Sequence, residues 1–352
     1  MTERADGLLG TQYELALRSG RRSVHAIITE VGAAVRQVLV DGVAITHTFA
    51  EHRVPPFFCG AVLVPWPNRV RDGRWVHEGR TLQLAINDRL RGNALHGLLC
   101  DVPYRLLDRS DCSITLGAQV SPQPGYPFRL DTEVCYRLTP HGLAATHTVR
   151  NIGSRRAPVA LGAHPFLTIG DVPGDALTLT VNALRHVDTD ARLIPVGVTA
   201  VPGTDWDLRG GRRIADLNLD DTWTSLLACE GGSVHSLRAP DGRCVSLWAD
   251  AGFGFVHVFI TREFPRDGEL VTAVAIEPVT APANAFNSGD GLRWLVPDQR
   301  TTASWAIRYD DGGPHRVRRG NDRPLSGLSP AGTPVTHVNH HSHQQNCGIA
   351  SR

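Results

Sequence analysis

The chain contains no lysine, so all 36 of its basic residues are arginine. Against them stand 35 Asp and Glu, which leaves a formal net charge of +1 over 352 residues. A balance this close to zero gives no general attraction to nucleic acid or to an anionic membrane surface. The composition therefore predicts neither a nucleic-acid partner nor a membrane partner.

The cysteines show no pattern of a disulfide framework or a zinc site. There are 7, an odd number, and no two of them stand as C-x-x-C. We expect buried free thiols in a reducing compartment. The N-terminal stretch lacks the positive and then apolar layout of a signal peptide, and no apolar run approaches the roughly 18 residues that span a bilayer. The expected location is therefore cytoplasmic.

Long helical patterns are also missing. Almost no segment keeps apolar residues at i, i+3, i+4 and i+7, and 35 Gly and 23 Pro interrupt the chain, so helices must be short and few. Short alternating runs separated by turn residues fill 11–50, 131–153 and 236–260, as in β-hairpins. With 41% hydrophobic residues the chain can bury a core. We predict a large all-β protein, with two packed sheets preferred to a closed barrel.

One domain and a tail are expected. No repeat or linker divides residues 1–311, whereas residues 312–352 are rich in Gly, Pro, Ser and His and have almost no large apolar side chain. Such a composition does not offset its ordering entropy, so we predict a disordered tail. Its segment HVNHHSHQQNC lacks the fixed ligand spacing of a structural metal site, and no metal is predicted.

Glu277 is the only ionisable residue between Leu270 and Gly289. A buried carboxylate must meet hydrogen-bond donors, a cation or a solvent-filled cleft, or else it is neutralised. The alternative is a carboxylate at a strand end that reaches solvent. Pro278 cannot donate to a sheet ladder, so we expect the strand to end or bulge there, at a rim where side chains often point into a pocket.

Two histidines stand apart from other titratable groups. His164 is alone in residues 161–170, and the proline after it favours an extended backbone at a strand end. His96 lies in GNALHGLL (92–99), where glycine lets the backbone approach a ligand closely. A hydrogen-bonded core histidine and a loop histidine are the respective alternatives.

Two more segments carry polar groups that suit a sugar. In VPWPNRVRDGRW (64–75), prolines fix the approach to Asn68 and Arg69, and a planar guanidinium on a stiff loop suits vicinal hydroxyls, although a surface arginine is the ordinary explanation. In NLDDTWTSL (218–226), two acids lie beside Trp223, a common way to hold a sugar. No P-loop, zinc motif or dinucleotide fingerprint competes with such a polar pocket.

These segments also carry a family resemblance. The stretches PNRVRDGRW, NALHG, AHPFL, LDDTW and AIEPVTAPANAFNSG are similar to motifs of the aldose 1-epimerase (galactose mutarotase) family, in family order and roughly family spacing over about residues 15–310. The resemblance implies a large antiparallel β-supersandwich, a small-molecule aldose as substrate, and no metal or organic cofactor.

The resemblance implies three catalytic residues. Glu277 is expected to be the general base, His164 the general acid, and His96 a donor that holds and polarises the sugar near its ring oxygen. Opening a cyclic hemiacetal removes the proton of the anomeric hydroxyl and protonates the ring oxygen, so a base and an acid must flank the C1–O5 bond. If each positioned group contributes on the order of 10²–10⁴-fold, the pair suffices without a metal.

The resemblance also implies the substrate contacts. Asn68 and Arg69 match contact residues of the family, and Asp220 matches the acid that grips sugar hydroxyls, with Asp221 as the alternative. In the strand where many members carry Gln, this chain has His257. A second departure is Phe166, where Tyr is usual after His-Pro. The two departures bear on which sugar is preferred.

Other functions remain open at this point. A hexose-6-phosphate 1-epimerase would need an arginine cluster for the phosphate dianion, for which Arg69, Arg71 and Arg74 are candidates. A non-catalytic sugar-binding domain would not need a matched base and acid. A retaining glycosidase would need a second carboxylate about 5–5.5 Å from Glu277. The expected assembly is a monomer or a homodimer.

Overall fold

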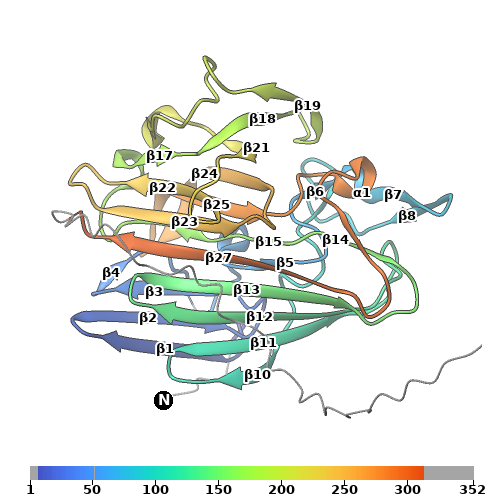
Figure 1. The fold of residues 1–352 in the computed structure, drawn as a ribbon, viewed down its shortest axis with the longest axis horizontal. Helices are drawn as coiled ribbons and strands as arrows, with labels where there is room; N and C mark the ends of the chain where they lie inside the picture. Colours follow the sequence, from blue (N-terminus) through green and yellow to red (C-terminus); the bar gives the residue numbers. More distant parts are fainter. Residues whose placement is uncertain (1–6, 51, 313–352) are drawn as a thin grey trace, which may run out of the picture. The chain divides into compact units, whose positions relative to one another are not determined.

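The computed structural model describes residues 7–50 and 52–312, and nearly all of its regular elements are strands (Figure 1). Every pair of named strands in these residues is antiparallel. The predicted antiparallel β-sandwich is confirmed. Short hairpin turns explain this result, because antiparallel neighbours can be joined by a few residues whereas parallel ones need a long crossover.

The largest sheet has nine strands and forms one layer of the sandwich. In sheet order they are β10 (Arg105–Arg109), β11 (Ser113–Val120), β12 (Leu130–Thr139), β13 (Gly142–Asn151), β27 (Arg300–Asp310), β23 (Cys244–Asp250), β22 (Gly232–Arg238), β17 (Thr178–Thr180) and β20 (Arg212–Arg213). The strand β12 buries every second side chain, from Leu130 to Leu138. This period of two is the pattern expected for a sheet with one face on the core.

Two further sheets pack on the nine-stranded one. The four-stranded sheet consists of β1 (Gln12–Ser19), β2 (Arg22–Thr29), β3 (Val35–Val40) and β4 (Val43–Ala44). The eight-stranded sheet runs β19 (Pro195–Ala200), β18 (Ala183–Thr189), β21 (Asp220–Leu226), β24 (Phe255–Arg266), β25 (Glu269–Val279), β15 (Gly162–Ala163) and β5 (Val62–Leu63), with β16 (Phe166–Leu167) also paired to β25. Strands β1 to β3 contact β12 and β13, and β25 contacts β23. The main hydrophobic core fills the space between the layers.

The remaining elements are small. Three strand pairs are β6 (Arg69–Val70) with β9 (Ala94–Leu95), β7 (Arg74–His77) with β8 (Arg80–Gln83), and β14 (Ala157–Val159) with β26 (Arg293–Leu295). Helical turns are η1 (Pro56–Phe58), η2 (Arg71–Gly73), η3 (Gly174–Ala176), η4 (Ile214–Asp216) and α1 (Ala285–Ser288). The expectation of short, rare helices is confirmed, and among the described residues no helix is long and apolar enough to cross a membrane.

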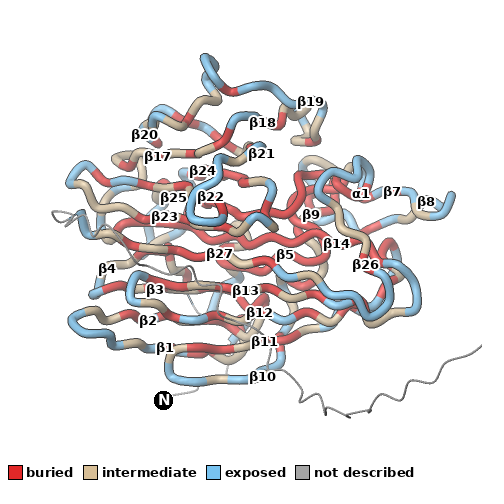
Figure 2. Tube along the Cα trace, viewed as in Figure 1, coloured by how far each residue is buried: buried red, intermediate tan, exposed pale blue. Residues whose placement is uncertain are grey.

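The central strand β25 is buried on both faces, because its residues from Thr272 to Val279 are all buried (Figure 2). It keeps a regular register with β24 through Pro278 and ends one residue later, at Val279, so no bulge lies at Pro278 and the strand end expected there is displaced by one residue. The bulge of this strand pair lies instead between Thr261 and Phe264.

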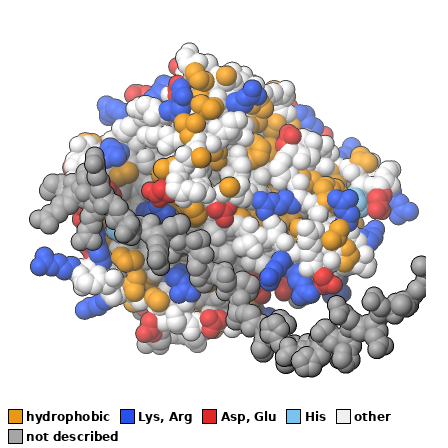
Figure 3. Space-filling model, in the orientation of Figure 1, with side chains coloured by type: hydrophobic (Ala, Val, Ile, Leu, Met, Phe, Trp, Pro, Cys, Tyr) orange, Lys and Arg blue, Asp and Glu red, His pale blue; other side chains and the backbone are white. Residues whose placement is uncertain are grey.

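Two other expectations can be compared with the described residues. Of the free cysteines only Cys59 is buried, and Cys229 is exposed, so the prediction of buried thiols is wrong for most of them. On the face shown in Figure 3, arginine and acidic side chains are intermixed, as the near-zero net charge suggests. The predicted tail, with its HVNHHSHQQNC segment, lies outside the described residues apart from its first position, Gly312. The strand β27 ends just before it.

Candidate active site

A pocket of about 540 Å³ opens at the eight-stranded sheet, and all predicted site residues except Trp223 line it. From the sheet come His257 on β24, Glu277 on β25 and Asp220 on β21, and from the loops and short strands beside it come Asn68, Arg69, His96 and His164. The sequence places these residues far apart. Strand pairing and the loop at residues 60–69 bring them together.

His164 lies at the break between β15 and β16, both of which pair with β25. Its backbone bonds to a different segment, since its N–H donates to the carbonyl of Ala61 and its carbonyl accepts from the N–H of Gly60. On this side of β25, the N–H groups of Ile276 and Thr280 donate to the carbonyls of Pro165 and Leu161. By the register of β15 with β25, Pro278 lies opposite Ala163, and its nitrogen, which has no hydrogen, donates no bond to β15.

The His164–Glu277 pair lies in the pocket, with Nε2 of the histidine 3.2 Å from Oε1 of the glutamate. Glu277 is 1% exposed. Among the described residues neither Oε1 of Glu277 nor Nδ1 of His164 has a hydrogen-bond partner, so the contact has the distance of an ion pair without the alignment of a hydrogen bond. Buried polar atoms normally find partners, and such exceptions mark functional sites. The sequence predicted a base and an acid that flank the C1–O5 bond, and in the structure the two groups lie in direct contact.

Burial determines the protonation of this pair. It raises the pKa of Glu277 to about 8, with Asp220 adding to the effect and His257 and Arg69 opposing it. It lowers the pKa of His164 to about 3, helped by the charge of His257. Both shifts disfavour the charged form of the group, as expected when a side chain leaves water. The substrate-free pair therefore holds one proton at neutral pH, and burial favours its placement on Glu277.

His96 is prepared to donate a hydrogen bond. Its Nδ1 accepts the backbone N–H of Asn68 at 3.2 Å. Burial lowers its pKa, as do the charges of His164, Arg69 and His257, so the ring is neutral and its one proton lies on Nε2. The backbone of His96 has a positive φ of 62°, and Gly97 follows with 78°. A Cβ on Gly97 would lie 2.2 Å from the carbonyl oxygen of Val64, so this glycine allows close approach of two backbones and not of a ligand.

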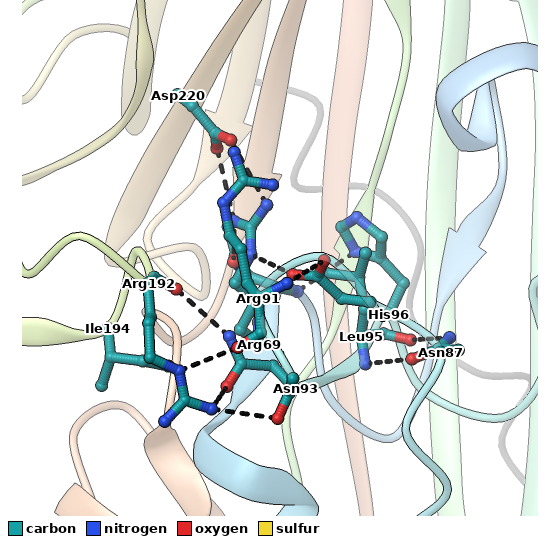
Figure 4. Close-up of polar contacts among 12 residues, drawn as sticks. Arg69, Asn87, Arg91, Asn93, Leu95, His96, Arg192, Ile194 and Asp220 are labelled. Carbon is teal, nitrogen blue, oxygen red and sulfur yellow. Dashed lines mark hydrogen bonds and ion pairs between the residues drawn. The ribbon is translucent and has the colours of Figure 1, made fainter.

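Asp220 and Arg69 form a polar pair that lines the pocket (Figure 4). The guanidinium of Arg69 donates to Asp88 through Nε at 3.0 Å, and its two terminal nitrogens lie 3.4 and 3.3 Å from the oxygens of Asp220. Burial would raise the pKa of Asp220, but the hydrogen bond and charge of His257, together with Arg69, hold it well below its usual range. Asp220 is therefore a fixed carboxylate that can accept sugar hydroxyls.

His257 stands directly opposite Glu277 in the β24–β25 register. Its Nε2 donates to Asp220 at 3.1 Å, and its Nδ1 bonds the hydroxyl of Thr222 at 2.8 Å. Burial would lower the pKa of His257, but Glu277 and Asp220 outweigh it and raise the pKa. Because both ring nitrogens are engaged within the protein, His257 offers a sugar its ring edge and its charge, and not a free hydrogen-bonding atom.

Trp223 does not line the pocket, contrary to the prediction. It is 1% exposed, and its Nε1 donates to the carbonyl of Trp206. The reason is the alternation of strand β21, which places Asp220 and Thr222 on one face and Asp221 and Trp223 on the other. Of the two candidate acids, Asp220 lines the pocket, whereas Asp221 bonds His186 on the far face.

Several lining residues were missed from the sequence. Phe57, Phe58, Leu90, Leu95, Phe259 and Ile260 form an apolar wall, and Arg91, Arg262, Asn218 and Glu263 add polar groups. Nothing local in the sequence indicates that these residues line a pocket. The segment that contributes Arg91 is fixed by Arg192, which donates to the carbonyls of Arg91 and Gly92 at 2.8 and 3.0 Å (Figure 4).

The motif that ends in PANAFNSG also supports the site. The side-chain oxygen of Asn284 accepts the backbone N–H of Arg71 at 3.1 Å, and this contact holds the segment after Arg69.

Within residues 7–50 and 52–312, no group of three or more His, Cys, Asp or Glu side chains is arranged to hold a metal ion.

Known proteins resemble this chain along most of its length. A family model described as aldose 1-epimerase matches residues 14–308. The chain is 31% identical over 295 residues to the uncharacterized protein YihR of Escherichia coli strain K12, and this alignment covers 83% of this chain and 88% of that protein. It is 32% identical over 221 residues to the galactose mutarotase of Rattus norvegicus, and this alignment covers 57% of this chain and 61% of the rat protein.

Solved structures share the fold. A GalM/aldose epimerase homologue from C. elegans superposes with a TM-score of 0.73 at 16% identity, over 85% of this chain and 99% of that one. A galactose 1-epimerase from Lactobacillus acidophilus NCFM gives a TM-score of 0.71 at 17% identity, over 88% of this chain and 98% of that one. At such identities the likeness concerns the fold alone.

Proposed function

The chain belongs to the aldose 1-epimerase family, and we propose that it is a mutarotase that interconverts the α and β anomers of an aldohexose. The observation that carries the proposal is the contact between His164 and Glu277 within the pocket, at 3.2 Å. The two oxygens that exchange protons in the reaction, O1 and O5, are bonded to the same carbon. An acid and a base that lie side by side can therefore serve both of them.

In the proposed reaction the pair acts in its ionic form on the bound sugar. Glu277 as carboxylate takes the proton of the anomeric hydroxyl, His164 as imidazolium protonates the ring oxygen, and the C1–O5 bond breaks. After rotation about C1–C2, His164 takes the C5 hydroxyl proton as that oxygen attacks C1, and Glu277 returns its proton to O1. The cycle conserves protons and ends with the ionic pair restored.

The proton of the substrate-free pair is favoured on Glu277, so binding must move it to His164 before ring opening. Two groups support this transfer. The charge of His257 lowers the pKa of Glu277 and so opposes the effect of burial. A sugar hydroxyl that bonds the unpartnered Oε1 of Glu277 would also favour the carboxylate, because donors to the charged form stabilise it. His96, with its proton on Nε2, is the proposed donor near the ring oxygen.

A hexose-6-phosphate 1-epimerase is the second candidate function. The arginines that could bind its phosphate differ from most of those expected from the sequence. Arg71 pairs with Asp190 and Arg74 bonds Gln83, and neither lines the pocket. Arg91 and Arg262 do line it. Among the described residues the guanidinium of Arg91 makes no hydrogen bond or ion pair, and that of Arg262 bonds only the carbonyl of Leu217. These two side chains could bind an anionic group on a sugar.

A sugar-binding domain without catalysis explains the pair less well. Burying Glu277 without a hydrogen-bond partner for Oε1 reduces stability, and binding alone does not need a carboxylate next to an imidazole. Functional sites commonly retain such unfavourable arrangements because the chemistry depends on them.

Polarimetry tests the proposal. Freshly dissolved α-glucose, α-galactose and their 6-phosphates are followed with the wild type, Glu277→Gln and His164→Gln. The expected result is a rate above buffer for the wild type with at least one free aldose, and a loss on the order of 10²–10⁴-fold in each variant. A preference for the 6-phosphates that disappears in Arg91→Ala would favour the second candidate. A wild-type rate equal to buffer with every sugar would refute both.

A further inference from the structure

A second histidine, His186 on β18, lies behind the pocket between two carboxylates. Its Nδ1 is 2.9 Å from Oδ1 of Asp188, and its Nε2 is 3.0 Å from Oδ1 of Asp221. A carboxylate only accepts hydrogen bonds, so a protonated ring nitrogen of His186 donates to the carboxylate beside it. The side chain is 2% exposed, so the cluster is buried within the protein.

Two tryptophans enclose the ring of His186. It stacks on Trp206 with a centroid distance of 3.8 Å and an interplanar angle of 5°, and its edge meets Trp223 at 5.4 Å. Trp223, predicted from the sequence to hold a sugar, thus packs against this histidine. Asp188 is fixed in turn by Thr199 of β19, whose hydroxyl donates to Oδ2 at 2.6 Å.

Asp221 connects this cluster to the pocket. Its Oδ1 accepts from His186, and its Oδ2 accepts the backbone N–H of Asp220 at 3.1 Å. Asp220 points to the other face of β21, where its carboxylate lies 3.3 to 3.4 Å from the terminal nitrogens of Arg69. Those contacts are long for charge-assisted hydrogen bonds, which are usually about 2.7–2.9 Å. The carboxylate of Asp220 also accepts from Nε2 of His257 at 3.1 Å, and Asp221 adds an anchor on the backbone of the same residue.

We propose that His186 and Asp221 are positioning residues that hold Asp220 for sugar binding, through the contact of His186 with Asp221 and of Asp221 with the backbone of Asp220. The inference rests on the proposed function, because it assigns Asp220 to sugar hydroxyls. A group that binds ground state and transition state alike affects KM and leaves kcat nearly unchanged. Loss of the anchor is therefore expected to appear in KM.

The matched variants are Asp221→Ala and Asp188→Ala, each of which removes one carboxylate from the same histidine. Only Asp221 touches Asp220. Asp221→Ala is expected to raise KM on the order of tenfold with kcat within about threefold, as for the loss of one hydrogen bond to a charged residue. Asp188→Ala is expected to lower the melting temperature similarly but to leave KM close to the wild-type value.

Rescue by a conservative variant separates positioning from simple structural support. In Asp221→Asn the amide carbonyl can accept the N–H of Asp220 while the amide nitrogen donates to His186, so KM should return close to the wild-type value. Equal KM in the two alanine variants, or no rescue by asparagine, would overturn the inference. A wild type inactive with every aldose would instead refute the proposed function, so the two failures are distinguishable in one set of assays.

Discussion

Glu277 and His164 are each held in the form that is uncharged when the pocket contains no sugar. Burial raises the pKa of Glu277 to about 8 and lowers that of His164 to about 3. Burial of these two groups should make the stability of the fold depend on pH, because each group has a different pKa in the folded and the unfolded protein.

The pH dependence of stability tests the state of Glu277. Its pKa is raised in the folded protein from an ordinary value of 4.5 to about 8, so the folded state binds the proton more tightly and stability falls as pH rises between those values. Glu277→Gln cannot titrate. Its stability relative to the wild type should therefore grow between pH 5 and pH 8, by about 3–4 kcal/mol, measured by urea unfolding.

The control for that measurement is Glu133→Gln, an exposed glutamate on β12. It should track the wild type at every pH. If Glu277→Gln also tracked the wild type, the carboxyl group would be ionised in the folded protein, and burial would not control its proton.

At the scale of single elements, the site depends on how short strands and turns present side chains. Strand β21 sends Asp220 to the pocket and Asp221 to His186 because neighbouring side chains point to opposite faces. The pair β6–β9 presents Arg69 and His96 through backbones with positive φ at Asn68 and His96. Such conformations are uncommon outside glycine and are retained where the surroundings impose them.

A substitution at Gly97 tests the turn that follows β9. Both Gly97 and Gly79 have positive φ, 78° and 73°, but only Gly97 has a backbone atom in the way, since nothing lies within 4 Å of a Cβ on Gly79. Gly79→Ala should cost about 1–2 kcal/mol for the left-handed backbone and leave turnover intact. Gly97→Ala should cost more and also reduce turnover, because the clash with Val64 displaces His96. Urea unfolding and polarimetry measure both effects, and similar results for the two variants would contradict this account.

At the scale of the whole described molecule, the pocket exists because one strand order joins distant segments. The β24–β25 pair places His257 opposite Glu277, β21 pairs with β24 to add Asp220, and β15 and β16 pair with β25 on its other edge to add His164. The nine-stranded sheet carries none of these groups. It contributes the second layer that buries the apolar faces.

Truncation tests the predicted domain boundary. The strand β27 ends at Asp310 and lies between β13 and β23 in the nine-stranded sheet. Removal of residues 315–352 is expected to leave turnover and melting temperature unchanged, whereas truncation before Arg300 removes a central strand and should prevent folding. Turnover measured by polarimetry and thermal unfolding compare the two chains. A large loss of turnover in the shorter deletion would show that the tail contributes to the site.

The sequence by itself determined what depends on local pattern. Alternating apolar residues, turn residues and the absence of helical periodicity predicted an antiparallel sandwich, and lone titratable residues in apolar segments identified Glu277, His164 and His96. These signals are local, because strand alternation and the difficulty of burying a charge are visible within a few residues.

The tertiary structure decided what depends on pairing between distant strands. It placed Glu277 and His164 side by side, used both nitrogens of His257 within the protein, and turned Trp223 away from the pocket against His186. It also placed Pro278 inside β25, one residue before the strand ends at Val279. The face, the register and the protonation of each group follow from which strands pair, and no short stretch of sequence contains that information.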